Sequence, residues 1–171
     1  MHGQGGQPGG IVVLALTRGG CALGERLATQ LGADFRSCRG RVAVEMRRAW
    51  QSHRALVCIM AAGIVVRTIA PLLADKRHDP AVVVCDEAGR FAIPLVSGHL
   101  GGANELAREV ARLTGGAAAL TTASDVLGRT ALDLWCRDLG LQVADRAGLT
   151  AAMGRLVDEG ALTLWSCCPL P

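Results

Sequence analysis

The chain has 171 residues, half of them apolar, which suffices for one domain with a sizeable core and the start of a second. No apolar run reaches the roughly 18 residues that span a bilayer, which argues against a membrane protein. A net charge of +3, with 3% aromatic residues and no tyrosine, argues against nucleic-acid binding. Residues 1–10 lack a charged segment before an apolar core, so we expect a flexible lead-in and no signal peptide.

The seven cysteines, at positions 21, 38, 58, 85, 136, 167 and 168, contain no C-x-x-C pair. Their odd number and apolar surroundings indicate a reducing compartment, so we expect a cytoplasmic protein without a disulfide framework. The adjacent pair Cys167-Cys168 matches no zinc pattern, and we expect no protein metal site.

The basic residues are seventeen arginines and a single lysine, Lys76. Lysine supplies a compact ammonium that arginine cannot replace, which makes Lys76 a candidate functional residue. Chance in an arginine-rich composition explains it equally well.

The first half of the chain alternates apolar runs with amphipathic segments. The run at 11–17 predicts a buried strand, and leucines at helical spacing predict a helix over 21–31 that ends at Gly32. A short strand over 33–38, a helix over 42–50 and a buried strand over 55–61 follow. A helix over 64–74 is interrupted by Pro71, and 75–80 is a charged loop.

In the second half, strands over 81–86 and 90–96 around a turn at 87–89 predict a hairpin. A helix over 103–113, a strand over 117–121, helices over 130–139 and 149–157 and a strand over 161–165 complete the pattern. This alternation predicts an α/β domain over 11–145 in three layers: a mainly parallel sheet, helices on both faces and one antiparallel hairpin strand. Residues 146–171 are expected to begin a further region.

Four polar or glycine-rich turns are expected at strand ends, where such sheets bind ligands. They cover 17–20, 61–63, 97–104 and 121–125, and each precedes a helix or probable helix. Because a helix N-terminus presents N–H groups and partial positive charge, these turns suit an anionic ligand or a developing oxyanion.

The turn at 97–104 is the most specific. Gly98, Gly101 and Gly102 let the backbone approach a ligand, and His99 is an acid–base group that works near neutrality. Asn104 and Glu105 begin the following helix. A structural role explains the same spacing equally well: the glycines permit a tight turn and His99 lies on the surface.

Other chemistries fit this turn less well. It lacks the Lys-Ser/Thr of a P-loop and the G-x-G-x-x-G of a dinucleotide site, and no G-x-S-x-G elbow surrounds Ser97. Asp75, Asp79, Asp86 and Glu87 are candidate bases, but we interpret Asp86 and Glu87 as ordinary charges of a hairpin turn.

Several segments together resemble the CbiG family of cobalamin-biosynthesis proteins, in order along the chain. They are GIVVR at 63–67, IAP at 69–71, DK at 75–76, DPAVVV at 79–84, SGHLGGANELA at 97–107 and TTASD at 121–125. The resemblance runs from about residue 11 to 165.

The resemblance implies a cobalt-precorrin-5A hydrolase of the anaerobic vitamin B12 pathway. Such an enzyme opens the δ-lactone on ring A and releases acetaldehyde, giving cobalt-precorrin-5B. Cobalt travels in the substrate, so no cofactor is expected. The family's C-terminal CobE-like domain is absent from these residues, and a separate CobE-like chain or another enzyme of the pathway is a candidate partner. The alternative is a corrinoid-binding or scaffold module without activity of its own.

The resemblance supplies no catalytic residue, so the following roles are hypotheses from the residues. His99 is the expected base, Asn104 and Glu105 are further catalytic candidates, and N–H groups of 101–104 are expected to stabilise an oxyanion. Arg18, Arg67, Lys76 and Arg77 are expected to meet the substrate's carboxylates. The remaining substrate-binding candidates are Thr17, Gly63, Ser97, Gly98, Gly101, Gly102, Thr121, Thr122 and Asp125.

Strand direction decides whether these residues share one site. We predict that the loop 75–80 returns along the sheet, so that strand 81–86 is antiparallel to strands 11–17 and 55–61. Strand 90–96 would then be parallel, and Thr17, Gly63, Ser97, His99 and Thr121 would surround a single crevice. A parallel strand 81–86 would instead place His99 on the far edge from Gly63.

Overall fold

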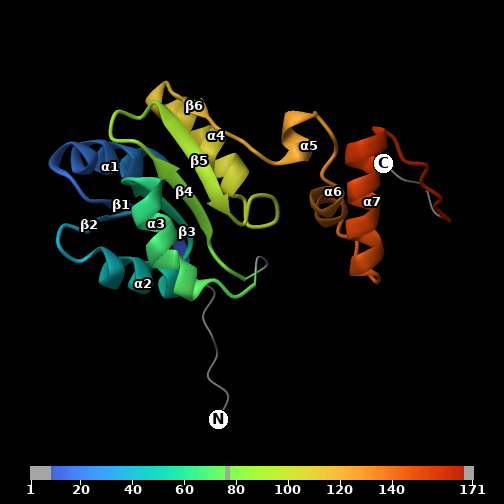
Figure 1. Cartoon of the computed structure of the whole chain (residues 1–171), viewed down its shortest axis with the longest axis horizontal. Helices are drawn as coiled ribbons and strands as arrows, with labels where there is room; N and C mark the ends of the chain where they lie inside the picture. The colour runs from blue at the N-terminus through green and yellow to red at the C-terminus, as the bar shows by residue number, and fades with distance from the viewer. Residues whose placement is uncertain (1–8, 76–77, 168–171) are drawn as a thin grey trace, which may run out of the picture. The chain divides into compact units, whose positions relative to one another are not determined.

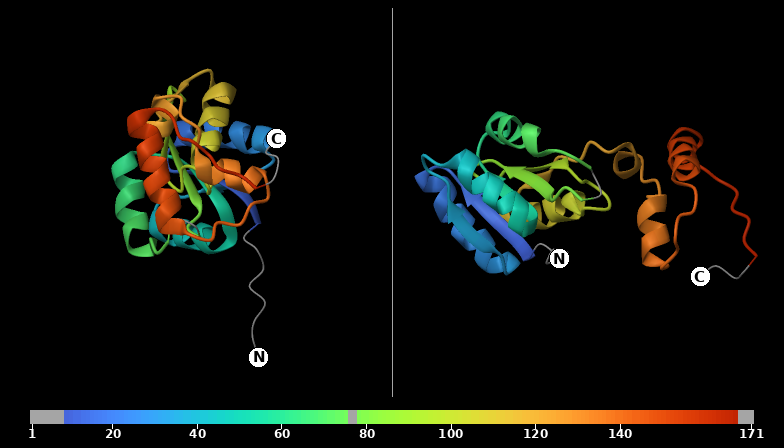
Figure 2. Two further views of the ribbon diagram at one scale, coloured as in Figure 1. Left: turned by 90° about the vertical axis from the view of Figure 1, so that its right-hand side faces the viewer. Right: turned by 90° about the horizontal axis from the view of Figure 1, so that it is seen from below.

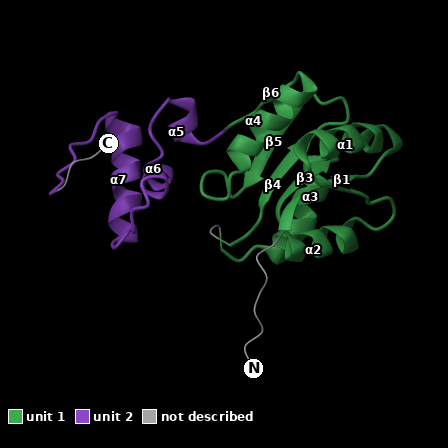
Figure 3. Cartoon of the chain, turned by 180° about the vertical axis from the view of Figure 1, so that it is seen from behind, with its two compact units in different colours: residues 1–120 green, residues 121–171 purple. Residues whose placement is uncertain are grey.

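The protein is described by a computed structural model that covers residues 9–75 and 78–167. The chain forms two compact units, which divide between Leu120 and Thr121 (Figure 3). This division falls earlier in the chain than the boundary at residue 145 expected from the sequence.

The first unit is built on a six-stranded sheet (Figure 1). Its strands are β1 (Gly9–Ala15), β2 (Asp34–Ser37), β3 (His53–Ile59), β4 (Ala81–Cys85), β5 (Phe91–Val96) and β6 (Ala117–Ala118). In the order β2-β1-β3-β4-β5-β6, the first four strands are mutually parallel, β5 is antiparallel to β4, and β6 is parallel to β5. The predicted mainly parallel α/β fold is confirmed.

Two helices cover each face of the sheet (Figure 2). α1 (Arg18–Leu31) and α4 (Ala103–Thr114) pack on one face, and α2 (Val42–Ser52) and α3 (Ala62–Ile69) on the other. A 3₁₀ turn at Ala70–Leu72 continues α3, because proline cannot extend its hydrogen-bond ladder. Alternating side chains of the apolar strands supply both cores, as Val13 and Leu14 of β1 illustrate.

The prediction that strand 81–86 is antiparallel to its predecessors is wrong. β4 pairs with β3 in parallel register, Ala55 opposite Ala81 and Ile59 opposite Cys85. The reason is the crossover between them: α3 and its 3₁₀ turn carry the chain back along the sheet before β4 begins. The loop after Leu72 therefore does not have to climb the sheet, and β5 is the strand that reverses.

The second unit is helical in its described residues, with α5 (Ala123–Val126), α6 (Leu132–Asp138) and α7 (Arg146–Glu159). Of the described residues after 120, Ser124 and Leu132 are the buried ones. The strand predicted over 161–165 is wrong: this segment has no regular structure. Trp165 is 94% exposed, and no neighbouring strand among the described residues pairs with the segment.

A hydrogen-bonded chain of side chains joins the starts of β2 and β3 across β1. His53 Nε2 lies 2.9 Å from Asp34 Oδ2, and His53 Nδ1 lies 2.8 Å from Ser52 Oγ. The imidazole is buried whereas the carboxylate is mostly exposed. The hydrogen bond from His53 lowers the pKa of the Asp34 carboxyl below its ordinary value of 3.8.

Asp34→Asn is expected to lower stability near pH 7. Because the folded pKa of Asp34 is depressed, its contribution is present above the ordinary value of 3.8 and is lost as the pH falls through the folded value. Urea midpoints of the wild type and Asp34→Asn at pH 7 and pH 3 test this. The difference between the two urea midpoints should be smaller at pH 3 than at pH 7. An equal difference at both pH values would contradict the stabilising role given to the Asp34 carboxylate.

Gly116 is required by a close backbone approach between the β4–β5 hairpin and the start of β6. A Cβ atom there would lie 2.2 Å from the carbonyl oxygen of Gly89 and 2.7 Å from that of Arg90. Gly63, in α3, has nothing within 4 Å of the same position.

Gly116→Ala is expected to destabilise the first unit by about 1–3 kcal/mol, because backbone atoms must move to admit the methyl group. Gly63→Ala is the matched control and should be neutral or slightly stabilising, since alanine is the better helix former. Urea unfolding of both variants measures the difference. Equal stability of the two variants would contradict the prediction, because it would show that the hairpin backbone moves to admit the methyl group without a loss of stability.

Candidate functional site

The residues predicted for one site fall into three groups in the structure. The turn at 97–105 follows β5. Thr17, Arg18, Gly63 and Arg67 follow β1 and β3. Thr121, Thr122 and Asp125 belong to the second unit.

The turn after β5 is held by a strained serine. Ser97 is buried with φ of 58°, and it is the one non-glycine among the described residues with a positive φ. Its hydroxyl donates to the carbonyl of Asp79 at 2.9 Å. Such conformations cost roughly 1–3 kcal/mol and concentrate at functional sites.

Two glycines of this turn are there for steric reasons. A Cβ on Gly101 would lie 2.3 Å from Ser97 Cβ, and a Cβ on Gly98 would lie 2.9 Å from Asn104 Oδ1. Asn104 is 3% exposed, so its carboxamide packs inside the turn. The turn is therefore rigid and has no room for side chains at these glycines.

The backbone amides of the turn are engaged internally. Gly102 N–H donates to His99 O at 2.9 Å, Ala103 N–H to Ser97 O at 3.1 Å and Asn104 N–H to Gly98 O at 3.0 Å. The expectation that these three amides are open to an oxyanion is not met in this structure.

The titratable candidates of the turn differ in setting. His99 is partly exposed at the tip of the turn. Glu105 lies in the first turn of α4, with its side chain 70% exposed, and pairs with Arg108. Glu105 and Arg108 are three positions apart on α4, which is a common spacing for ion pairs on the exposed side of a helix.

The loop before β4 lies against this turn. Asp79 accepts the Ser97 hydroxyl through its backbone carbonyl, and its carboxylate accepts Ala74 N–H at 3.0 Å. Asp79 therefore joins Ala74 to the glycine-rich turn. Lys76 and Arg77, predicted to meet substrate carboxylates, lie outside the described residues.

The second group lies at the opposite edge of the sheet, at the carboxyl ends of β1, β3 and β4. Thr17 caps α1, its hydroxyl oxygen accepting Gly20 N–H at 3.0 Å, and donates to Glu87 Oε2 at 2.6 Å. A Cβ on Gly19 would meet the Glu87 carboxylate. An acid at a helix N-terminus is favoured by the helix dipole.

The contact of Glu87 with Thr17 is one that the sequence does not indicate. The sequence offers Glu87 as a candidate base and favours an ordinary hairpin charge, yet its carboxylate reaches across the end of β3 to Thr17. Correct assignment of β4 as parallel would have placed Glu87 at the same edge as Thr17.

The single-crevice prediction is therefore wrong. β1 and β3 end at one edge, whereas the antiparallel β5 delivers Ser97 and His99 to the other. The two groups are separated by about the length of a strand, roughly 17–20 Å. A single small group held at His99 therefore does not also contact Thr17 or Gly63.

Thr122 and Asp125 bond to each other within the second unit. Thr122 Oγ1 donates to Asp125 Oδ2 at 2.8 Å at the start of α5. Thr121 directly precedes them. The pair has the form of a local helix-start hydrogen bond.

A pocket of about 420 Å³ opens at the starts of β1, β2 and β3, beside His53, Asp34, Ser52 and Arg36. None of the residues predicted for the site lines it. It is a polar hollow at the edge of the sheet, separate from the glycine-rich turn.

The buried thiols are held neutral. Burial raises the pKa of Cys38 and of Cys85 to about 11, and raises that of Cys58 as well. Because the thiolate is the nucleophile and the metal ligand, these cysteines are inert core residues.

The comparisons with known proteins agree on one family. The family described as cobalamin synthesis G N-terminal matches residues 45–125. A cobalt-precorrin-5A hydrolase of Salmonella typhimurium is 39% identical over 171 residues, covering 93% of this chain and 49% of its own length. A cobalt-precorrin-5A hydrolase of Priestia megaterium is 41% identical over 120 residues, and this match covers 70% of this chain and 32% of the relative.

A solved structure from Sulfolobus solfataricus, described as a cobalamin biosynthesis protein G homolog, shares the fold. Its TM-score is 0.56 at 21% identity, over 88% of this chain and 46% of that one. The chain thus spans at most about half the length of these relatives. From the family match and the two relatives near 40% identity, we conclude that the chain belongs to the cobalamin synthesis G (CbiG) family and carries its N-terminal region.

Proposed function

We propose that the chain serves in the hydrolysis of cobalt-precorrin-5A, opening the ring A δ-lactone and releasing acetaldehyde to give cobalt-precorrin-5B. The observation that carries this proposal is the 39% identity, over 93% of the chain, to a relative with that name. Cobalt belongs to the substrate in this scheme, and the protein supplies no cofactor. The free cysteines fit a reducing cytoplasm.

The Ser97–Asn104 turn is the proposed reaction centre. It combines a strained serine, an acid–base histidine and a rigid glycine backbone, and the family match includes all of it. Strain at a residue that neighbouring hydrogen bonds hold in place is typical of catalytic sites.

In the proposed reaction His99 takes a proton from water as the water oxygen attacks the lactone carbonyl. The carbonyl C–O bond to the ring oxygen then breaks, and that oxygen receives the proton and becomes a hydroxyl. In the second step this hydroxyl loses its proton to solvent and its C–O bond becomes the carbonyl of acetaldehyde. The carbon–carbon bond to the macrocycle breaks at the same time, and its electron pair enters the conjugated macrocycle, which takes up a proton from solvent. Asn104 acts as a positioning residue, because its buried carboxamide packs against Gly98 beside His99.

The edge of the sheet at the carboxyl ends of β1 and β3 is proposed to bind substrate and not to take part in the reaction. Thr17, Arg18, Gly63 and Arg67 lie too far from His99 to contact the same lactone. Arg18 and Arg67 are exposed cations there, suited to a substrate carboxylate on another arm of the macrocycle. Since the relatives are about twice as long or more, a C-terminal domain or partner enzyme is proposed to complete the enclosure.

His99→Ala is expected to slow lactone opening by on the order of a hundredfold or more, because general-base catalysis is lost. His78→Ala, in the exposed loop before β4, is the matched control and should retain activity. Acetaldehyde release from purified protein is the readout, with thermal unfolding to show that both variants fold. Normal turnover in His99→Ala would remove this residue from the mechanism.

Activity of the wild-type chain alone tests the proposal itself. Acetaldehyde release without added protein would support a complete reaction centre. Tight corrinoid binding without release would favour the scaffold alternative.

Lys76→Met is expected to weaken corrinoid binding by about 1–3 kcal/mol, the scale of a hydrogen bond to a charged group. The expectation stands on Lys76 being the single lysine among seventeen arginines. Titration with the substrate or its cobalt-free analogue measures the dissociation constant. An unchanged constant would make Lys76 an ordinary surface charge.

A further inference from the structure

The strongest concentration of charge in the chain lies between positions 36 and 54. That segment contains six arginines and one acidic residue, Glu45, so it carries more positive charge than the net +3 of the whole chain. It includes the end of β2 and all of α2. Surfaces without a ligand generally mix both signs, so such a local excess calls for an explanation.

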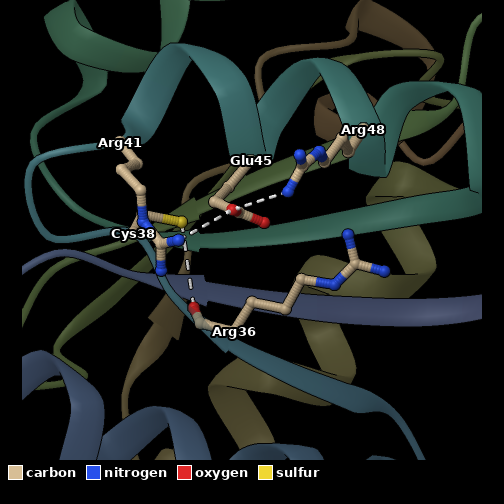
Figure 4. Close-up of polar contacts among 5 residues, drawn as sticks. All are labelled: Arg36, Cys38, Arg41, Glu45 and Arg48. Atoms are coloured by element: carbon tan, nitrogen blue, oxygen red, sulfur yellow. Dashed lines mark hydrogen bonds and ion pairs between the residues drawn. The ribbon is translucent and has the colours of Figure 1, made fainter.

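Two of these arginines contact Glu45, and we call Arg41, Glu45 and Arg48 the arginine cluster (Figure 4). Glu45 Oε1 lies 3.9 Å from Arg41 Nη1 and 3.3 Å from Arg48 Nη1. The spacings of four and three residues place both arginines on the same side of α2 as the carboxylate. Figure 4 shows the Arg36 side chain extending from β2 below that helix.

One carboxylate cannot neutralise two guanidinium groups. The Glu45 side chain is 9% exposed, whereas those of Arg41 and Arg48 are 66% and 65% exposed. Each guanidinium offers five N–H donors in a planar fork, and a contact with one oxygen of Glu45 uses few of them. The arginine cluster therefore has surplus positive charge facing solvent around a carboxylate that it already holds.

The arginine cluster begins at a ligand-binding edge of the sheet. Cys38 N–H donates to Ala15 O at 2.7 Å, so the loop between β2 and Arg41 lies against the end of β1. Thr17 and Arg18 follow there. The order β2-β1-β3 with α1 and α3 on opposite faces makes this edge the point where ligands bind in doubly wound sheets.

We propose that the arginine cluster is a binding site for the carboxylate arms of a polycarboxylate ligand, contacted by Arg41 and Arg48. Both arginines already pair with a carboxylate, that of Glu45. The planar fork of a guanidinium group can bind both oxygens of a carboxylate. The expectation that the ligand is a tetrapyrrole rests on the proposed function. The site lies at α2, which follows β2, and the order of the sheet places three strands between β2 and β5.

Titration with uroporphyrin, a tetrapyrrole with a carboxylate on every side arm, tests the proposal by fluorescence. Arg41→Gln/Arg48→Gln should weaken binding by roughly tenfold or more, because two charge-assisted hydrogen-bonding groups are lost. The affinity of Arg41→Lys/Arg48→Lys for uroporphyrin should lie between those of the wild type and the glutamine variant, since lysine keeps the charge but lacks the planar guanidinium fork.

Arg47→Gln/Arg155→Gln is the matched control, because it removes the same charge from exposed positions. Arg47 lies two residues from Glu45 and so faces away from it on α2. A change below about twofold in this control, with a large loss in the cluster variant, supports the proposal. The proposal is overturned if both double variants lose the same amount of affinity for uroporphyrin, or if the wild type does not bind uroporphyrin.

This experiment separates the site from the reaction. Uroporphyrin has no lactone, so its binding does not depend on turnover, and acetaldehyde release does not enter the readout. Loss of activity in His99→Ala with normal uroporphyrin binding would leave both proposals standing. Cluster-dependent binding in a chain that never releases acetaldehyde would support this site and count against the proposed function.

Discussion

The hairpin between β4 and β5 determines at which edge of the sheet each functional residue lies. The Asp86 carboxylate accepts the N–H groups of Ala88 at 2.9 Å and Phe91 at 2.7 Å, which reverses the chain within five residues. Gly89, with φ of 70°, completes the turn. Two later features depend on this reversal. β6 runs in the direction of β5, and the glycine-rich turn lies at the edge of the sheet where the first four strands start, next to the start of β4.

The consequence is a molecule with two polar edges. One edge joins Thr17 and Glu87 at the N-terminus of α1, and the other joins Ser97 to Asp79. A small substrate would use only one of them. The substrate proposed above carries several ionised side arms besides its reacting ring, so the proposal assigns the arms and the ring to different surfaces of the domain.

Local patterns predicted most elements and failed where direction depends on distant packing. The apolar runs of β1, β3 and β4 and the glycine stop at Gly32 are local signals, and the elements they predict are present. The direction of β4 depends on where α3 ends, which its sequence leaves open because Pro71 allows a 3₁₀ continuation. The segment around Trp165 has strand-like residues, but pairing needs a neighbouring strand, and none of the described residues offers one.

The same limit applies to the candidate site. The sequence singled out Ser97, His99 and Asn104, whose spacing is local, and the structure holds Ser97 and Asn104 in one rigid turn. It did not indicate the contact between Glu87 and Thr17, because these residues are 70 positions apart in the chain. Partners across the sheet follow from topology alone, so one wrong strand direction grouped Thr17 and Gly63 with His99, although they lie at opposite edges of the sheet. The turn itself is unaffected.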